Sequence, residues 1–269
     1  MKGIWKAIVY FVMYFGLTLI LQILLSIGFM AIGAANGLRD ETLIIEFVNN
    51  NILGMTVISG ILTVIALYLI FKIRKKRIKQ EWKLNKFKIR DVVLASVISF
   101  SFSFLFALST YDVSMENSLM ISKSVDFYSE IFPMLGIILM VANLLVIAPI
   151  AEEIALRGII YTRVEKTTNA IIAIIVSSIL FGVMHLSAGG VTLVIGAMLM
   201  ALVFGYVFYK FDSLWVCIIA HAVANLPDFI LYNKPNFSSS MLWVLKIFFV
   251  CLFIIGLYAI HKMTQSEIE

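Results

Sequence analysis

Long runs of apolar residues, broken only by short polar stretches, extend along almost the whole chain. Several approach or exceed about 20 residues, the length a helix needs to cross the hydrocarbon core of a bilayer. Backbone groups in lipid must find their hydrogen bonds within the protein, which leaves helices or a closed barrel. The runs lack the strict alternation of barrel strands. The pattern therefore predicts an all-α, polytopic membrane helix bundle.

The apolar runs divide into about eight expected membrane helices. Their approximate ranges are 7–33, 52–72, 92–110, 131–152, 170–187, 190–209, 213–231 and 241–261. The first follows a short basic start, as in a signal peptide, but its apolar part is well beyond the usual length of a signal sequence. We therefore interpret it as a membrane helix. No internal repeat or low-complexity linker divides residues 1–269, which we treat as one domain.

Composition supports this interpretation, because 62% of the residues are hydrophobic and only 14% are charged. A soluble chain would carry about a quarter charged residues. The two cysteines, Cys217 and Cys251, both lie in apolar runs, so a disulfide framework is not expected.

One loop carries most of the positive charge. Residues 71–91 contain ten of the 21 Lys and Arg residues, and short loops rich in these residues remain in the cytoplasm. Alternation along the predicted spans then places both the N- and the C-terminus in the cytoplasm. The positive charge of this loop would attract anionic membrane lipids or bind an acidic partner. Nucleic acid is not expected to bind.

Charged groups inside membrane spans are costly and usually functional. Three predicted helices each place polar residues at i, i+4 spacing, which puts them on one face. The candidates are Glu152, Glu153, Arg157, His185, His221 and Asn225. In lipid, such polar faces turn inward and meet one another, so the sequence predicts one buried polar site.

The register of the predicted hairpin between two of these helices supports the prediction that their polar faces meet. Glu153 and His185 each lie 16 positions from Asn169, at the expected turn, so they should lie at the same height in the membrane. Pro149 should kink the helix before the glutamates, because it lacks the N–H that would bond to Leu145.

These polar residues also carry a family resemblance. "EEIALR" (152–157), "FGVMH" (181–185) and "HAVAN" (221–225) resemble the EExxxR, FxxxH and HxxxN motifs of the CPBP family, which contains the CAAX proteases and bacteriocin-processing (Abi) proteins. The resemblance covers about residues 140–232. It implies a catalytic core at about 131–232, with the N-terminal helices of 1–130 as an accessory part.

The resemblance implies an intramembrane endopeptidase of the glutamate type, historically classed as a metalloprotease. It would hydrolyse a peptide bond of a membrane-associated peptide or a lipidated protein. Its expected place is a bacterial plasma membrane, with the active site opening to the cytoplasm.

The candidate residues suit peptide hydrolysis by a water molecule. Glu153 is the expected general base, because a poorly solvated carboxylate gains basicity, and His185 would hold the same water. His221 and Asn225 would donate to the oxyanion. Glu152 would orient its neighbours or face Arg157.

A metal-dependent variant would use the same residues. Glu153, His185 and His221 could bind Zn²⁺, with water as the fourth ligand. Glu152 would then have to serve as the base, although adjacent helical residues point about 100° apart. The metal-free mechanism, with no cofactor, is favoured, and Zn²⁺ remains the alternative.

Three other interpretations stay open. One is a non-catalytic membrane protein of the same fold, such as a bacteriocin immunity factor or a peptide-binding scaffold. Another is a proton-coupled transporter, although transporters commonly show repeated halves and none is visible. Cys217 could act as a nucleophile with His221, but a small packing residue fits that position equally well. The sequence does not indicate an oligomeric state.

Overall fold

Helices make up almost all of the chain that the computed structural model describes, which is residues 2–110, 115–132, 134–231 and 237–266, and these residues form no strand. The predicted all-α fold is therefore confirmed. In chain order the elements are α1 (Lys2–Ala35), α2 (Glu41–Asn50), α3 (Ile52–Ile73), α4 (Ile78–Glu81), α5 (Ile89–Ser109), α6 (Met115–Ile131), α7 (Leu135–Ala142), η1 (Asn143–Ile147), α8 (Ala148–Glu153), η2 (Ile154–Tyr161), α9 (Thr162–Glu165), α10 (Ala170–Met184), α11 (Leu186–Phe211), α12 (Leu214–Ala224), α13 (Leu226–Ile230) and α14 (Ser239–Ser266).

Six helical stretches in the described residues are long and apolar enough to cross a membrane. They are Gly3–Ala35, Ile52–Ile73, Ile89–Ser109, Leu135–Glu165, Gly190–Phe211 and Ser239–Met263. Two shorter apolar helices, Ala170–Met184 and Leu214–Ala224, occupy the places of the predicted fifth and seventh spans. A helix is thus present at each predicted span, and the number that cross the bilayer stays a prediction.

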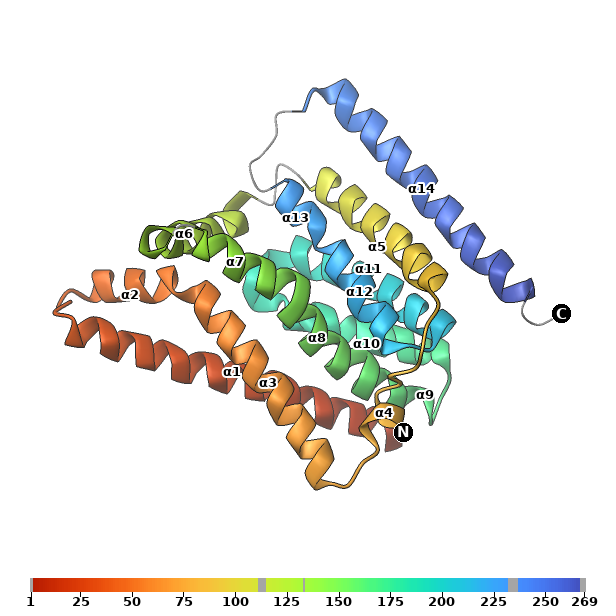
Figure 1. The fold of residues 1–269 in the computed structure, drawn as a ribbon, viewed down its shortest axis with the longest axis horizontal. Helices are drawn as coiled ribbons and strands as arrows, with labels where there is room; N and C mark the ends of the chain where they lie inside the picture. Colours follow the sequence, from red (N-terminus) through yellow and green to blue (C-terminus); the bar gives the residue numbers. More distant parts are fainter. Residues whose placement is uncertain (1, 111–114, 133, 232–236, 267–269) are drawn as a thin grey trace.

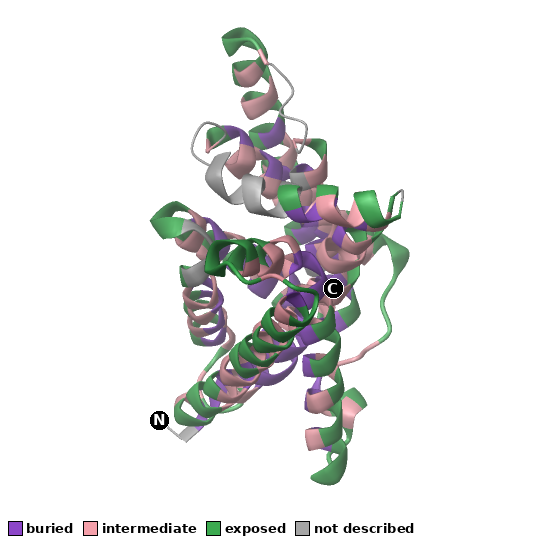
Figure 2. Cartoon of the chain, turned by 90° about the vertical axis from the view of Figure 1, so that its left-hand side faces the viewer, coloured by how far each residue is buried: buried purple, intermediate pink, exposed green. Residues whose placement is uncertain are grey.

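The bundle has a central group of helices with two flanking pairs. α8, α10, α11 and α12 lie in the middle, α1 and α3 on one side, and α5 and α14 on the other (Figure 1). The main apolar core joins side chains from η2, α11 and α12, among them Ile160, Phe208 and Leu214. Buried residues gather around this centre, whereas the outer helices expose much of their surface (Figure 2). Large apolar side chains along α1 and α14 are exposed, as expected of helices that face lipid.

Two helices, α2 and α6, lie outside the predicted spans. Their sequences are too polar to span a bilayer. Asp40 caps α2 by accepting hydrogen bonds from the backbone N–H groups of Thr42 and Leu43. Hydrogen bonding from Thr42 and Leu43 lowers the pKa of Asp40. The other helix, α6, packs against α2 and α7.

The predicted disturbance at Pro149 takes the form of a change in hydrogen-bond register. The stretch from Leu135 to Glu165 alternates between α-helix and the wider π-helix, with π-helical η1 before the proline and π-helical η2 after the glutamates. Pro149 follows π-helical η1 inside this continuous stretch, so its missing N–H falls where the hydrogen-bond register changes. Short π-helical turns inside α-helices occur frequently at functional sites.

Gly136 provides a test of the packing between α6 and α7. A Cβ atom at Gly136 would collide with the backbone carbonyl of Val125 in α6, and a backbone atom cannot rotate away. We expect Gly136→Ala to lower the free energy of unfolding by about 1–3 kcal/mol, measured by thermal unfolding in detergent. Gly28→Ala is the control, since nothing lies within 4 Å of its Cβ position. Equal melting temperatures for both variants would contradict this packing.

Candidate active site

The candidate site centres on Glu153, the last residue of α8, whose side chain is fully buried. Its Oε1 accepts a hydrogen bond from Nη1 of Arg157 at 2.9 Å and another from Nδ1 of His221 at 2.9 Å. Arg157 lies one turn further along, whereas His221 comes from α12. One carboxylate oxygen therefore holds two parts of the chain together inside the bundle.

Arg157 extends the same network to α10 and α11. Its Nη2 donates a hydrogen bond of 2.9 Å to the backbone carbonyl of Ala201. Its guanidinium carbon lies 5.4 Å from the ring centre of Phe181 and 5.3 Å from that of Phe204, within the range of cation–π attraction. The charge is fully buried, and such a charge is tolerated only when it is paired and hydrogen-bonded.

His221 lies between the two glutamates. A carboxylate can only accept, so the hydrogen bond to Glu153 places the proton on Nδ1 and leaves the lone pair of a neutral ring on Nε2. Nε2 lies 3.8 Å from Oε2 of Glu152. The ring stacks on Phe204 with 4.5 Å between the centres, which fixes its plane. The imidazole therefore connects a buried carboxylate to a more accessible one.

The two glutamates differ in access to solvent. The side chain of Glu152 is 19% exposed, whereas that of Glu153 is 0% exposed. Oε2 of Glu153 and Nε of Arg157 have no hydrogen-bond partner among the described residues. Both atoms are buried, so they are an unpaired acceptor and an unpaired donor inside the bundle.

His185 and Asn225 lie at the edge of this cluster. Nδ1 of His185 donates to the carbonyl of Phe181 at 2.8 Å, so its Nε2 also keeps a lone pair. The ring of Phe181 contacts both histidines, with its centre 4.7 Å from that of His185 and 5.9 Å from that of His221. Asn225 donates through Nδ2 to the carbonyl of Leu144 in π-helical η1, at 2.8 Å.

The structure thus brings four of the six candidates into direct contact, namely Glu152, Glu153, Arg157 and His221. Arg157 pairs with Glu153 rather than with Glu152. Within the described chain His185 forms no hydrogen bond or ion pair with either glutamate, and its ring packs against Phe181, which also contacts His221. The thiol of Cys217 lies 3.2 Å from the carbonyl of Phe204, so it contacts the backbone rather than His221.

Two residues near the site were missed by sequence analysis. Phe204 packs against both Arg157 and His221, but one phenylalanine among 21 gives no signal of its own. Tyr14 of α1 is buried within electrostatic range of both glutamates. Its only signal was a polar hydroxyl in the middle of an apolar run.

The arrangement does not fit a three-ligand metal site. Among the described residues no group of three His, Cys, Asp or Glu side chains is placed to hold a metal ion. Oε1 of Glu153, one of the predicted ligand atoms, already accepts two hydrogen bonds. We therefore derive no step through zinc, and the metal-free preference stays a prediction.

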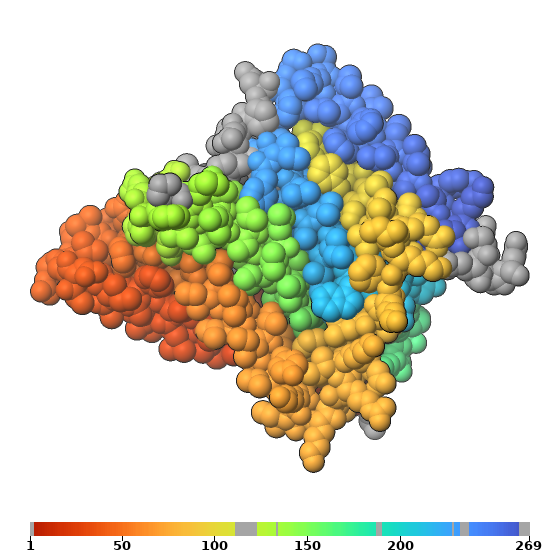
Figure 3. All heavy atoms as spheres, viewed as in Figure 1, coloured from red at the N-terminus to blue at the C-terminus, as the bar shows by residue number. Residues whose placement is uncertain are grey.

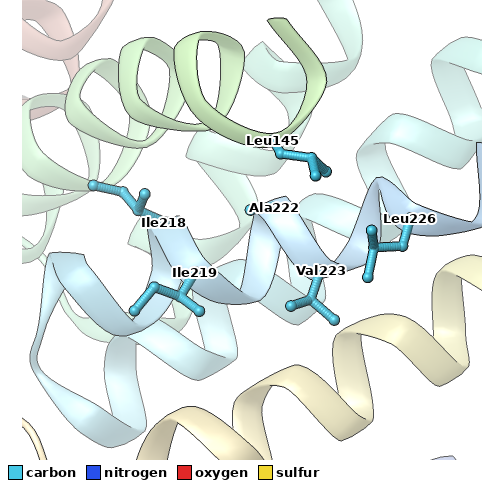
Figure 4. Close-up of a pocket in the computed structure, with 6 residues that line it drawn as sticks. All are labelled: Leu145, Ile218, Ile219, Ala222, Val223 and Leu226. Atoms are coloured by element: carbon cyan, nitrogen blue, oxygen red, sulfur yellow. The ribbon is translucent and has the colours of Figure 1, made fainter. Parts of the chain in front are cut away.

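An apolar cavity of about 190 Å³ lies between η1 and α12 (Figure 4). Its walls are Leu145, Ile218, Ile219, Ala222, Val223 and Leu226. Ala222 follows His221 directly, and Leu145 follows the residue that binds Asn225. The cavity is therefore adjacent to the polar cluster and has no polar side chain in its walls.

The fold and this cluster define a membrane-embedded helical protein with a buried carboxylate, guanidinium and imidazole. Residues 134–227 match the family model described as type II CAAX prenyl endopeptidase Rce1-like. The match includes all six candidate residues and confirms the resemblance to CAAX-protease-like membrane peptidases over that part of the chain.

Two relatives are similar over parts of their length. An uncharacterized protein of Mycoplasma capricolum subsp. capricolum is 29% identical over 167 residues, which are 58% of this chain and 48% of that protein. The "Putative membrane peptidase YdiL" of Bacillus subtilis is 30% identical over 90 residues, which are 34% of this chain and 36% of that protein. The aligned part thus spans about half of the first relative and about a third of the second. No solved structure matches.

Arg157 gives a test of the buried network. We expect Arg157→Met to lower the free energy of unfolding by about 3–5 kcal/mol, because it leaves the charge of Glu153 buried without a cation. Adding Glu153→Gln should restore part of that loss, measured as a double-mutant cycle of unfolding in detergent.

The matched control is Arg163→Met, which breaks a more exposed ion pair with Glu81 and should cost about 1 kcal/mol or less. An Arg157→Met protein as stable as Arg163→Met would show that the buried pair is not needed.

Proposed function

We propose that this protein is an intramembrane endopeptidase that cleaves a membrane-associated peptide or protein with an activated water molecule. The observation that carries the proposal is the contact of both glutamates with His221 inside the stretch that matches the CAAX endopeptidase family. The match at residues 134–227 supports a membrane peptidase in general. The cluster of acid, base and hydrogen-bond donors supports hydrolysis.

Peptide hydrolysis requires a base that can reach water and then the scissile carbonyl. Glu153 was the base expected from the sequence, but its side chain is fully buried and one of its oxygens is engaged by two donors. Glu152 keeps partial access to solvent and faces Nε2 of His221. We therefore assign the base to Glu152, with Glu153 as the residue that positions His221 and Arg157.

The remaining roles follow from the hydrogen bonds. Glu153 orients the imidazole of His221 from Nδ1, as the carboxylate does in a Ser–His–Asp triad, which leaves Nε2 free to take up and return a proton. The second N–H of Asn225 would donate to water or the oxyanion, and Nε2 of His185 would accept a hydrogen bond from water. Removing one such donor typically slows a reaction by about 10²–10³-fold.

The apolar cavity beside His221 supports a substrate with an apolar segment next to the scissile bond. Its walls are entirely aliphatic, so a polar side chain there would lose its hydrogen bonds to water. We propose that the site opens to the cytoplasm of a bacterial cell, because the basic loop of 71–91 pairs through Glu81 with Arg163 of α9, the helix that follows the site, and basic loops remain inside.

One observation favours a second candidate, a non-catalytic scaffold such as an immunity factor. Arg157 donates hydrogen bonds both to Glu153 and to the carbonyl of Ala201. The Glu153–Arg157 pair therefore also serves as a structural crosslink to α11. A scaffold would need this crosslink but not the partly exposed carboxylate of Glu152. The two functions are therefore separated by substitutions at Glu152.

We expect Glu152→Gln to reduce peptide cleavage by at least about 10²-fold while leaving the melting temperature unchanged, because it removes a base and no buried pair. Glu153→Gln should lose both activity and stability. Cleavage would be measured on membrane peptides in proteoliposomes, after candidate substrates are found by comparing membrane-peptide termini in cells that express wild type or Glu152→Gln.

The control is Glu46→Gln, an exposed position on α2 that should cleave at the wild-type rate. Equal processing by wild type, Glu152→Gln and Glu153→Gln would eliminate the protease assignment. A cellular function that survives Glu152→Gln but not Arg157→Met would support the scaffold.

Metal removal tests the choice between the two chemistries. We expect the purified protein to contain less than stoichiometric zinc and to keep its activity after dialysis against a chelator, because the two donors to Oε1 of Glu153 compete with a metal there. Elemental analysis and activity before and after chelation check this. One zinc per chain that is lost in His221→Ala would overturn the metal-free mechanism.

A further inference from the structure

The last two residues of α3 and those that follow it form a dense positive surface, which we call the basic segment, residues 72–79. It contains six cations, Lys72, Arg74, Lys75, Lys76, Arg77 and Lys79, and no acidic residue. All six are exposed, and none of them forms an ion pair within the described part of the chain. The end of α3 and this segment protrude from one end of the molecule (Figure 3).

The acidic groups nearest to this segment are engaged by other cations. Glu81 pairs with Arg163 and lies 3.9 Å from Lys166. Partial burial opposes the charged form of Glu81, but the hydrogen bond and charge of Arg163 and the charges of Lys166 and Lys76 outweigh it, so the pKa of Glu81 is lowered. The positive charge of the basic segment is therefore available to an external partner.

Exposed apolar side chains next to the cations indicate what that partner is. Ile73, within the segment, is 78% exposed, and Ile89, at the start of α5, is 77% exposed. A soluble acidic protein would leave such side chains in water. A membrane surface would cover them with acyl chains while its headgroups meet the cations. The segment directly follows a membrane-length helix, so it lies where that surface is.

The residues that follow, 81–85, connect this surface to the candidate site, and we call them the strap. Lys83 pairs with Glu165 at 2.9 Å and with Asp212 at 2.7 Å, and its backbone carbonyl accepts from the N–H of Leu214. Asn85 donates to both the carbonyl and the carboxylate of Asp212. The strap thereby joins the end of α9 to the start of α12, the helix that carries His221.

Trp82 brings the strap close to the buried network. Its side chain is buried and lies against Gly158, the residue after Arg157, where a Cβ would be 3.4 Å from the Cβ of Trp82.

The ion pairs of Lys83 keep this part of the strap charged. Burial opposes the charged form of Lys83, but its hydrogen bonds and ion pairs with Asp212 and Glu165 outweigh that effect and raise the pKa of Lys83. The strap thus contacts η2, the end of α9 and the start of α12, and it continues directly from the basic segment.

We propose that the basic segment binds the headgroups of anionic phospholipids and that lipid bound there holds the strap against the helices of the candidate site. Each basic residue near a charged membrane strengthens attraction by about fivefold. The attraction acts within a Debye length, about 10 Å at 0.1 M salt. The effect on catalysis rests on the proposed endopeptidase function, whereas lipid binding does not.

Lipid selectivity tests the proposal directly. The full chain is reconstituted in phosphatidylcholine vesicles that contain spin-labelled phosphatidylglycerol or spin-labelled phosphatidylcholine, and the fraction of each label held at the protein is measured by electron spin resonance. We expect wild type to prefer phosphatidylglycerol by about twofold or more. The preference should fall toward one in the variant Lys75→Gln, Lys76→Gln, Arg77→Gln, Lys79→Gln, and in 0.5 M salt.

The matched control keeps the charge and changes the side chains, as Lys75→Arg, Lys76→Arg, Arg77→Lys, Lys79→Arg, and should retain the preference. Inorganic phosphate at 10 mM should not displace the labelled lipid, because the partner is the bilayer headgroup rather than free phosphate. Wild-type selectivity in the neutralised variant would overturn the proposal. So would wild type that shows no lipid preference but binds a soluble acidic protein.

The catalytic part has a separate measurement. Phosphatidylglycerol should raise the cleavage rate of wild type and of the charge-preserving variant at unchanged KM, and should not raise that of the neutralised variant. Glu152→Gln should keep lipid selectivity and lack cleavage in every lipid. If no protein cleaves but selectivity follows the basic segment, the proposed function fails and lipid binding stands. If cleavage is present but independent of phosphatidylglycerol, the coupling through the strap fails.

Discussion

The structure depends on a single carboxylate oxygen, Oε1 of Glu153, which accepts hydrogen bonds from both Arg157 and His221. Within a bundle of apolar helices, a buried charge without a partner would cost several kcal/mol. Arg157 must therefore stay opposite Glu153, and its second hydrogen bond to Ala201 brings α11 to the same place. His221 adds α12. The interaction that makes a buried glutamate tolerable is the one that assembles three separate segments around it.

This arrangement divides the polar cluster into a structural half and an accessible half. Glu153 and Arg157 are closed off from solvent, while Glu152 is partly exposed and faces the free nitrogen of His221. The imidazole connects the two halves, and the aliphatic cavity is lined by residues of the same helix, among them Ala222 next to His221. The proposed endopeptidase function rests on this combination of a partly exposed carboxylate, an oriented imidazole and an adjacent apolar cavity.

The N-terminal part of the chain contacts the same helices that carry the polar cluster in the C-terminal part. Tyr14 of α1 lies near both glutamates, and the strap after α3 binds both the α9 end and the α12 start. These contacts connect the basic loop of 71–91 to the helices that carry the buried polar cluster. They also explain why substitutions far from Glu153 in sequence should alter its surroundings.

The sequence by itself determined the helical class, the positions of the apolar helices and four polar residues that contact one another, Glu152, Glu153, Arg157 and His221. Each of these depends on local properties, because hydrophobic length and i, i+4 spacing are written in neighbouring residues. Residues 152–157, 181–185 and 221–225 carried the family resemblance for the same reason.

Only the tertiary structure decided which glutamate takes Arg157, that the ring of His185 packs against Phe181, and that Trp82 lies against Gly158. The sequence left the partner of Arg157 open, and the π-helical register of η2 is absent from the apolar pattern. Such choices depend on how every neighbouring side chain packs and which backbone carbonyls remain free, and those are properties of distant segments brought together.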